Sequence, residues 1–326
     1  MLWVYKMIYI PNGGFKMKKY ILLILSIAIL FSLTACSSTG KEANGTLSIG
    51  VLPDVDSVPI IIADNEGYFK ENNLNVEIHL FHSAMDRDAA LQSRKIDGAV
   101  SDMLAALYGK EGGFNVKITS KTNGSYKLIT GKNSYIKNIS ELACRGIALS
   151  KNTVIEYAAD SILSYSGVDV SSINKIVIPQ IPTRLEMLRN GQVAAAVLPE
   201  PMASVAINEG ASLLASTDTL GINPGILLFT EDSISTKTSE LKKFYKAYNK
   251  AVDLLNKEDV KTFADILVQK AGFPEEFKNS PKLVTYEKAA LPSEEEFNNI
   301  NSWMKNNNQI KSEFKYSDVV YDEFVK

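Results

Sequence analysis

The sequence is poor in the residues that build disulfide frameworks and metal sites, because its 326 residues include only two cysteines, Cys36 and Cys144, and two histidines. Two cysteines leave little scope for a disulfide-stapled fold. The chain also lacks an excess of charge, since 35 basic residues face 37 acidic ones, a net charge of −2. Such a surface does not offset phosphate repulsion, so we expect no nucleic-acid partner. At 45% hydrophobic residues the composition predicts a folded protein, long enough for two domains.

Long apolar runs are also scarce, and the one that stands out lies near the N-terminus. Residues 20–33 follow a short basic segment and are too short to span about 30 Å of hydrocarbon comfortably. We therefore predict a signal peptide over residues 17–35. Its end, LTAC, resembles the lipobox of bacterial lipoproteins, which implies a diacylglycerol on the thiol of Cys36. The alternative is an uncleaved anchor helix with a chance cysteine. Residues 36–45 have the composition of a polar tether.

Residues 1–16 do not fit a signal peptide, which normally begins with its basic residues. We expect Met17 to be the true start. Residues 13–16, GGFK, match codons that would contain a ribosome-binding site just before the Met17 codon. Residues 1–16 would then be a mis-called leader.

Short apolar runs alternate with amphipathic stretches after the tether, which is typical of α/β architecture. A first series of strand, helix, strand, helix and strand is predicted at 47–51, 58–71, 76–81, 87–93 and 98–100. A second series in the same order is predicted at 146–150, 154–165, 175–178, 183–189 and 195–198.

The two series match at an offset of about 97 residues, which places Arg87 on Arg184 and Leu91 on Leu188. A single repeat is too little for a solenoid, so we predict two similar α/β lobes that face each other. Strands at 127–130 and 225–229 would serve as the crossings between the lobes. Lobe 1 is then expected over residues 46–128 and 225–326, and lobe 2 over residues 129–224.

The C-terminal part becomes helical after residue 230, and we expect it to pack on lobe 1. Apolar side chains from Leu241 to Leu255 recur at helical spacing, which favours a core-facing stripe over a ligand site. Ser293 and Glu296 form a capping-box pattern before a further helix.

Four segments carry a resemblance to bacterial solute-binding proteins for nitrate, sulfonates, taurine and thiamine-pyrimidine precursors. Together the likeness covers roughly residues 46–230. The segments occur in the family's order and with its gaps. They are residues 58–69 (VPIIIADNEGYF), 90–99 (ALQSRKIDGA), 139–146 (ISELACRG) and 188–201 (LRNGQVAAAVLPEP).

Two departures from the family pattern bear on the substrate class more than on the fold. Arg94 replaces the usual glycine, and Ala194 or Ala195 replaces the aspartate of the last segment. The resemblance implies a two-lobed α/β periplasmic-binding-protein fold of the second type, with the ligand cleft between the lobes. It further implies a monomer outside the cytoplasm, held to the membrane by lipidated Cys36, that delivers a small-molecule ligand to an ABC permease and its ATPase.

A cleft between α/β lobes is built from loops at the carboxyl ends of strands and from the helix N-termini that follow. Backbone N–H groups there are unsatisfied, so polar or anionic ligand groups dock readily. The candidate ligand-binding residues are Pro53, Asp54, Asp56, Ser83, Arg87, Ser101, Asp102, Ser125, Asn152, Thr153, Arg184, Leu198 and Glu200.

Several candidates have equally ordinary interpretations. Asn152 and Thr153 fit a helix cap as well as a ligand contact. Arg87 and Arg184 are a pair that would clamp a carboxylate or sulfonate, or else two solvent-facing arginines. Glu200 would stabilise a helix start or accept hydrogen bonds from an amine. The acidic candidates favour a ligand with donors or positive charge, but the sequence does not decide between such a ligand and an anion.

The sequence shows no motif of a metal centre, cofactor or hydrolase, and we expect no metal, no cofactor and no enzymatic activity. His79 and His82 stand three apart on a predicted strand, which places them on opposite faces. The alternatives are an enzyme like the fungal thiamine-pyrimidine synthases, whose resemblance implies a histidine- and cysteine-rich site, and a ligand-sensing lipoprotein without a transporter.

Overall fold

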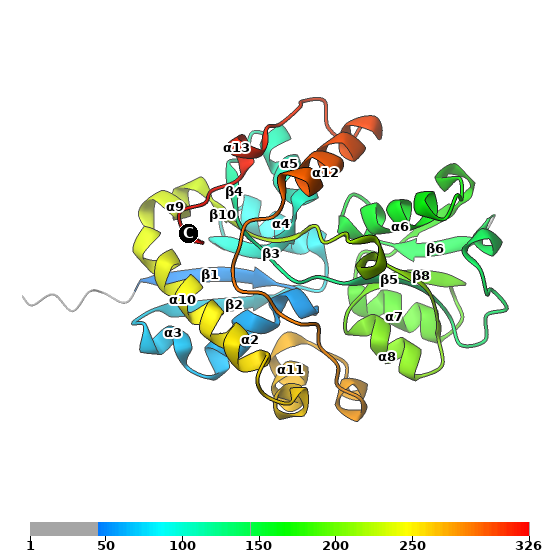
Figure 1. Ribbon diagram of the computed structural model, residues 1–326, viewed down its shortest axis with the longest axis horizontal. Helices are drawn as coiled ribbons and strands as arrows, with labels where there is room; N and C mark the ends of the chain where they lie inside the picture. The colour runs from blue at the N-terminus through cyan, green and yellow to red at the C-terminus, as the bar shows by residue number, and fades with distance from the viewer. Residues whose placement is uncertain (1–44, 144, 326) are drawn as a thin grey trace, which may run out of the picture. The chain divides into compact units, whose positions relative to one another are not determined.

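A computed structural model describes residues 45–143 and 145–325. The expected leader, the signal peptide, most of the tether and both cysteines lie outside these residues. The strands of the described part form two five-stranded sheets, which we call sheet 1 and sheet 2 (Figure 1). We define lobe 1 as sheet 1 with its helices and lobe 2 as sheet 2 with its helices.

Sheet 1 has the order β2-β1-β3-β10-β4. The first three strands are parallel, and β10 runs antiparallel to both neighbours, because it returns from the other lobe. The strands are β1 (Thr46–Val51), β2 (Asn75–Leu80), β3 (Gly98–Asp102), β4 (Val116–Lys121) and β10 (Gly225–Thr230).

Sheet 2 repeats this plan in the order β7-β6-β8-β5-β9, with β5 as the antiparallel strand. Its strands are β5 (Tyr126–Thr130), β6 (Gly146–Leu149), β7 (Asn174–Val177), β8 (Ala195–Pro199) and β9 (Ser212–Ser216). The predicted α/β class, the order of elements and the two facing repeats are confirmed.

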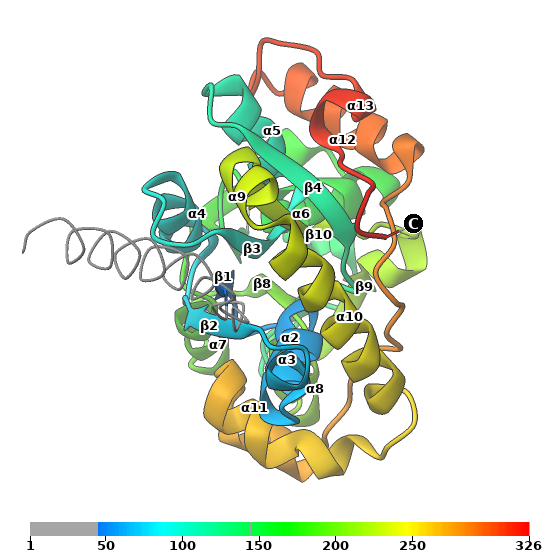
Figure 2. The ribbon, with the colours of Figure 1, turned by 90° about the vertical axis from the view of Figure 1, so that its left-hand side faces the viewer.

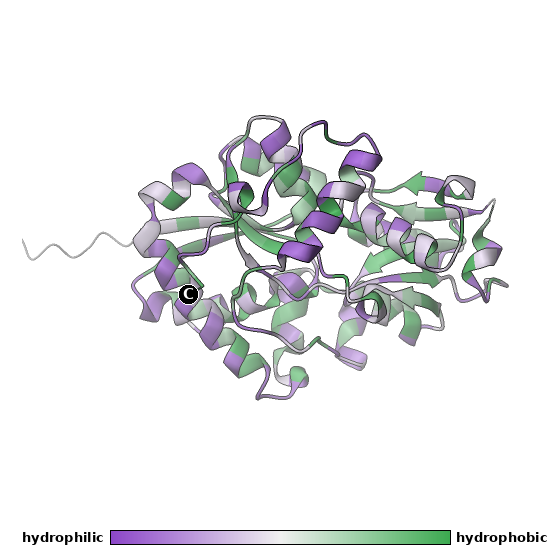
Figure 3. Ribbon diagram, turned by 45° about the horizontal axis from the view of Figure 1, so that its top comes forward, coloured by the Kyte–Doolittle hydropathy of each residue, from purple (hydrophilic) through white to green (hydrophobic). Residues whose placement is uncertain are grey.

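Helices cover both faces of each sheet, because the central strands are apolar on both sides. In β8, for example, Val197 packs into one core while Ala196 and Leu198 pack into the other. The hydropathy colouring shows the same pattern, with hydrophobic strands inside and hydrophilic outer helix faces (Figure 3).

One face of sheet 1 packs against α2, α3, α9, α10 and α11, and the opposite face against α4, α5, α12 and α13 (Figure 2). In lobe 2, α6 covers one face, and α7 and α8 cover the other. The bounds are α2 (Val58–Asn65), α3 (Tyr68–Glu71), α4 (Ala84–Gln92), α5 (Met103–Glu111), α6 (Val154–Tyr165), α7 (Ile181–Arg189), α8 (Met202–Asn208), α9 (Glu231–Thr236), α10 (Thr238–Leu255), α11 (Ala264–Ala271), α12 (Glu294–Asn306) and α13 (Tyr316–Val319).

The C-terminal helices pack on lobe 1, as expected. Leu241, Phe244 and Tyr245 of α10 join the core with Leu47 and Ile49 of β1. The Ser293 side chain accepts a hydrogen bond from the backbone N–H of Glu296 and so caps α12. Within the described residues, none of the helices combines the length and hydropathy that a membrane span requires.

Two details of the expected organisation differ. The single helix predicted over residues 58–71 is two helices, because Gly67 between α2 and α3 has a left-handed backbone with φ of 73°. The lobe boundary expected at residue 128 falls inside β5, which pairs along its full length with β8 of sheet 2. The chain therefore passes between the sheets over residues 122–125 and 217–224, and the strands at 127–130 and 225–229 are sheet members.

Candidate ligand site between the two sheets

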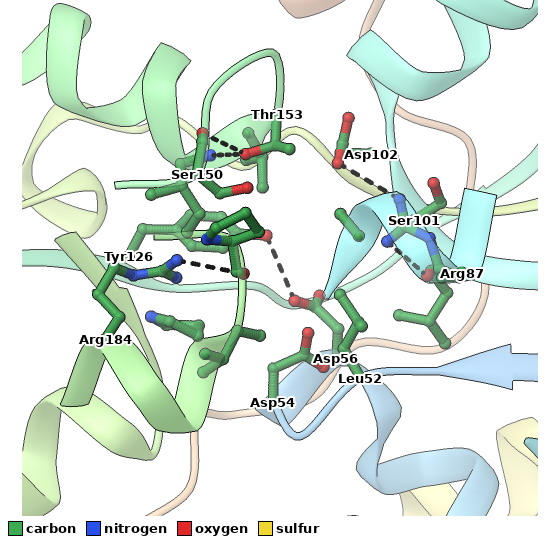
Figure 4. Close-up of a pocket in the computed structure, with 17 residues that line it drawn as sticks. Leu52, Asp54, Asp56, Arg87, Ser101, Asp102, Tyr126, Ser150, Thr153 and Arg184 are labelled. Carbon is green, nitrogen blue, oxygen red and sulfur yellow. Dashed lines mark hydrogen bonds and ion pairs between the residues drawn. The ribbon is translucent and has the colours of Figure 1, made fainter. Parts of the chain in front are cut away.

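A small cavity lies between the two sheets and is lined from both lobes (Figure 4). Its polar side chains follow the carboxyl ends of parallel strands, as in other open α/β sheets. Asp54 and Asp56 follow β1, Asp102 ends β3, and Thr153 follows β6. The topology therefore brings residues far apart in the chain to one site.

Seven of the predicted site residues line this cavity: Asp54, Asp56, Arg87, Ser101, Asp102, Thr153 and Arg184. Thr153 also caps α6, because its side chain accepts a hydrogen bond from the N–H of Ile155 at 3.2 Å. Its two expected roles, helix cap and cleft residue, are thus both compatible with the geometry.

The other six lie outside the lining. Ser83 caps α4 by accepting from the N–H of Asp86, and Ser125 donates to Asp218 at 2.9 Å. Asn152 sits in a separate groove and donates its N–H to Glu156 at 2.7 Å. The remaining three, Pro53, Leu198 and Glu200, are buried against protein, with Leu198 in a lobe 2 core.

Contacts within lobe 2 explain why Glu200 does not face the cavity, as it was expected to. Its carboxylate pairs with Lys127 of the neighbouring strand and accepts hydrogen bonds from the N–H and hydroxyl of Ser204. The negative charge therefore stabilises the first turn of α8 and the β5–β8 pair, rather than facing the cavity.

The prediction missed several lining residues, among them Tyr126, Ser150 and the apolar Leu52 and Ile155. Ser150 follows β6 just as the chosen candidates follow their strands, but the predicted strand ran one residue too long and included it. Tyr126 opens β5 and donates its hydroxyl to Asp56 Oδ2 at 3.5 Å across the lobes. No local pattern in the sequence marks that contact.

Arg87 projects from α4 into a network of acids within lobe 1. Its Nη2 lies 2.7 Å from Asp88 Oδ1 and 3.8 Å from Asp102 Oδ2, and its Nη1 donates to the Val100 carbonyl at 3.1 Å. Burial alone would lower the pKa of Arg87, but the two carboxylates outweigh it and raise that pKa above its usual value. The charge of Arg87 is therefore neutralised by the protein.

Arg184 holds the matching place on α7, and its environment is different. Its Nε donates to the Val197 carbonyl at 2.9 Å and its Nη1 to the Ile178 carbonyl at 2.8 Å, while Nη2 has no partner. The side chain is 0% exposed. Burial lowers its pKa to about 9, and no carboxylate of the described residues lies within ion-pair distance. A buried cation without an acid is costly, so a ligand acceptor here would relieve that cost.

Asp54 and Asp56 form the acidic side of the cavity on lobe 1. Asp54 caps the turn that precedes α2 by accepting from the N–H of Ser57 at 3.2 Å and from its hydroxyl at 2.9 Å. Burial raises the pKa of Asp54 well above its usual value, and burial raises the pKa of Asp56 to about 6. In the part of the chain that the structure describes, neither carboxylate has a lysine or arginine at ion-pair distance, and Asp56 Oδ1 has no partner.

Asp102 lies at the start of α5 and also faces the start of α6 in lobe 2. Its Oδ1 accepts from the N–H of Ala105 at 2.9 Å. Burial raises the pKa of Asp102, while Arg87 and the N–H groups of Ala105 and Val154 act to lower it. Val154 is the first residue of α6. The Asp102 carboxylate therefore faces the N-termini of two helices, α5 of lobe 1 and α6 of lobe 2. Over residues 45–143 and 145–325, no group of three or more acidic, histidine or cysteine side chains is arranged to hold a metal.

Comparison with known proteins identifies the family. The family model described as NMT1/THI5 like matches residues 54–262, more than half of the chain. The chain belongs to the NMT1/THI5-like family. The match begins at Asp54 and spans every lining residue of the cavity except Leu52. The family resemblance seen in the four sequence segments is thereby confirmed.

A curated relative of this chain is described as a putative ABC transporter periplasmic binding protein of Brachyspira hyodysenteriae. It is 24% identical over 261 residues, which cover 74% of this chain and 75% of the relative.

Solved structures with the same fold include the alkanesulfonate-binding protein SsuA from Xanthomonas axonopodis pv. citri bound to MOPS. Its TM-score is 0.74 at 17% identity, covering 87% of this chain and 100% of that one. A zinc-bound ligand-binding component of an ABC-type import system from Staphylococcus aureus also has a TM-score of 0.74, at 15% identity, covering 86% of this chain and 98% of that one. The chain thus has the periplasmic-binding-protein fold, and the Brachyspira relative and the Staphylococcus protein are described as binding proteins of ABC-type systems.

Proposed function

We propose that the protein is the extracytoplasmic solute-binding component of an ABC importer, which captures a small solute between its lobes and delivers it to a permease. The observation that carries the proposal is the cavity itself, because both lobes contribute buried polar atoms to it that have no protein partner. Buried polar groups are normally hydrogen-bonded, so the presence of such atoms from both lobes at one cavity supports a ligand there. Family membership and the named relatives support the same role.

Contacts across the lobes support a binding cycle of closure and opening. The N–H of Val55 in lobe 1 donates to the Glu200 carbonyl, and the N–H of Ile181 in lobe 2 donates to the His82 carbonyl, both at 3.0 Å. The rings of Tyr157 and Trp303 meet edge to face at 5.2 Å between centroids. Opening would break these contacts by rotation about residues 122–125 and 217–224, and a solute that bridges the lobes would favour the closed form.

Ligand-dependent thermal unfolding of the full-length protein tests this role. The panel contains sulfonates, nitrate and pyrimidines, the ligand classes to which the resemblance points. A solute at a hundred times its Kd adds about 2.7 kcal/mol of stability. At roughly 2–4 °C per kcal/mol, such binding gives a clear shift in Tm. A panel without any shift would contradict the proposal.

We further propose that the mature protein is held at the membrane by a lipid on Cys36, with residues 37–45 as its tether. The basic segment, the short apolar run and the LTAC sequence support this anchor. Labelling of cells with a radioactive fatty acid tests it. The label should appear on the wild-type protein and on Cys144→Ala, its matched control, but not on Cys36→Ala. Equal labelling of Cys36→Ala would refute the anchor.

We propose a binding role rather than the enzyme alternative; in its support, the described lining residues of the cavity include no histidine and no cysteine. The synthase resemblance implied a site rich in those side chains. A solute that is recovered unchanged after incubation with the protein is the expected result.

A further inference from the structure

The charged side chains around the cavity divide into a paired set and an unpaired set. Arg87 and Asp102 form the paired set, together with Asp88 behind them. The unpaired set has Asp54 and Asp56 on lobe 1 and Arg184 on lobe 2. Figure 4 shows the two aspartates and Arg184 on different sides of the cavity. The unpaired set has the charges that a ligand would have to meet.

One place at the cavity where an anion could dock is faced by a carboxylate of the protein. Helix N-termini attract anions through their free N–H groups and their dipole. At the start of α6, whose first residue is Val154, the carboxylate of Asp102 faces these groups. A ligand that consisted of an anionic group alone would compete with this carboxylate and would also approach Asp54 and Asp56.

Four buried polar atoms of the cavity lining have no hydrogen-bond partner among the described residues. One of them, Arg87 Nη2, lies in the ion pairs with Asp88 and Asp102. The other three are Asp56 Oδ1 and Ser101 Oγ on lobe 1, and Arg184 Nη2 on lobe 2. Asp56 Oδ1 needs a donor, Arg184 Nη2 needs an acceptor, and Ser101 Oγ serves as either. The side chains of Asp56, Arg184 and Ser101 are 3%, 0% and 5% exposed, respectively, so a molecule inside the cavity is well placed to supply these partners. The Thr122 hydroxyl also bears on the Asp56 carboxylate.

We infer that the solute carries a hydrogen-bond-donating nitrogen that binds Asp54 and Asp56, and an acceptor group that binds Arg184. This inference rests on the proposed function and narrows its ligand class. Anions without an amino group, such as simple alkanesulfonates and nitrate, are then poor ligands. Two chemistries share the required pattern, an open-chain amino acid or aminosulfonate and an amino-substituted heterocycle. Between its polar ends such a solute contacts Leu52, Ile155 and the ring of Tyr126.

Matched pairs of probes test the inference by calorimetric titration of the full-length protein. One pair is aminoethanesulfonate and ethanesulfonate, and the other is aminopyrimidine and pyrimidine; nitrate is added as a bare anion. In at least one pair, the amino-bearing probe should bind about 10- to 100-fold more tightly than its partner, the usual effect of a hydrogen bond to a charged group. Which pair responds tells the open-chain and heterocyclic chemistries apart.

Variants of Asp54 and Asp56 test whether their carboxylates are the reason that amino-bearing probes bind more tightly than their partners. Asp54→Asn retains a side-chain acceptor for the Ser57 cap, and Asp56→Asn retains the shape of the side chain. In the double variant the advantage of the amino group should fall to less than about threefold. The matched control is Asp160→Asn, which also removes a buried acid but lies outside the cavity, beside Lys175. This control should discriminate as the wild type does.

Three results would overturn the inference: equal binding within both pairs, binding of ethanesulfonate or nitrate without binding of any amino-bearing probe, or discrimination that survives in the double variant. Binding of anions alone would leave the proposed solute-binding role intact and remove this inference. If no probe and no member of the wider panel binds, the inference and the proposed function fail together.

Discussion

The two lobes are built on one plan, and a comparison of their arginines shows where they diverge. Arg87 and Arg184 are 97 positions apart, and each donates to the carbonyl of the residue 13 positions later, Val100 or Val197. The same offset relates Asp88 to Leu185 and Asp102 to Pro199. Lobe 1 therefore supplies the acids that neutralise its arginine, whereas lobe 2 has apolar residues at both places. The difference indicates that lobe 1 completes its own charge network and lobe 2 leaves an opening for a ligand.

Removal of Arg87 should give the largest effect on stability. Arg87→Met leaves the buried Asp102 and the half-buried Asp88 without their cation, which costs about 3–5 kcal/mol of the free energy of unfolding. Urea unfolding without ligand measures this cost, with Arg184→Met as the matched substitution in the other lobe. Equal losses for the two variants would remove the contrast between the lobes.

Removal of the Asp56 carboxylate should stabilise the ligand-free protein. The pKa of Asp56 is raised from 3.8 to about 6 by burial, so the folded state binds more protons than the unfolded state between these values. Stability from the protonated acid is then fully present below about pH 4 and is lost as the pH rises through about 6.

The side chain of Asp56→Asn does not titrate. The difference in free energy of unfolding between the variant and the wild type should therefore grow from about pH 4 to about pH 6 and stay constant at higher pH. A shift of this size corresponds to on the order of 1–3 kcal/mol near pH 7. Asp54, Asp102, Arg87 and Tyr126 face the same carboxylate and remain in both proteins. Unfolding curves from pH 4 to 8 measure the difference, and a gap that does not change with pH would contradict the account.

The helix after the first strand provides a further contrast. In lobe 1 it is broken at Gly67, whereas α6 at the corresponding place in lobe 2 runs unbroken over twelve residues. Gly67→Ala should cost about 1 kcal/mol, because a Cβ at φ of 73° is strained although nothing lies within 4 Å of it. Gly67→Asn should lose less, since asparagine tolerates this conformation. Thermal unfolding compares the two variants, and a larger loss for asparagine would contradict this explanation of the break.

Arg184→Met should have the smallest effect on the ligand-free protein, within about 1 kcal/mol. The substitution leaves the Val197 and Ile178 carbonyls without a side-chain donor but relieves a buried charge that has no acid, and the two effects oppose each other. The same variant should lose most of the stabilisation that a bound solute adds. Urea unfolding with and without solute separates the two effects; an equal gain from solute in both proteins would contradict the role of Arg184.

The strands and the repeat could be predicted from the sequence because alternating apolar runs and helical periodicity are local properties. The 97-residue offset even placed Arg87 and Arg184 correctly on matching helices. The sequence did not indicate that Arg87 meets Asp102 or that Glu200 meets Lys127, since these contacts depend on how the sheets pair. The expected clamp of two equivalent arginines therefore has an unequal geometry, with a free donor atom on Arg184 and acids around Arg87.

The lobe boundary shows the same limit. The apolar run at 127–130 was predicted as a strand, but its sequence does not tell which sheet it joins. Its pairing with β8 and β9 settles that it belongs to sheet 2. Ser150 was missed by one residue at a strand end, which is the usual error of boundary prediction from sequence.

Recovery of the solute from the protein itself is the decisive experiment for an amino-bearing ligand held by Arg184. Full-length wild type and Arg184→Met are incubated with the same metabolite extract, washed, and denatured, and the released small molecules are identified by mass spectrometry. We expect the wild-type protein to release one small molecule in an amount nearly equal to that of the protein. This molecule should bear both an amino group and an acceptor group, and it should be absent from the variant. Release of no small molecule, or of the same one in equal amount from both proteins, would contradict this expectation.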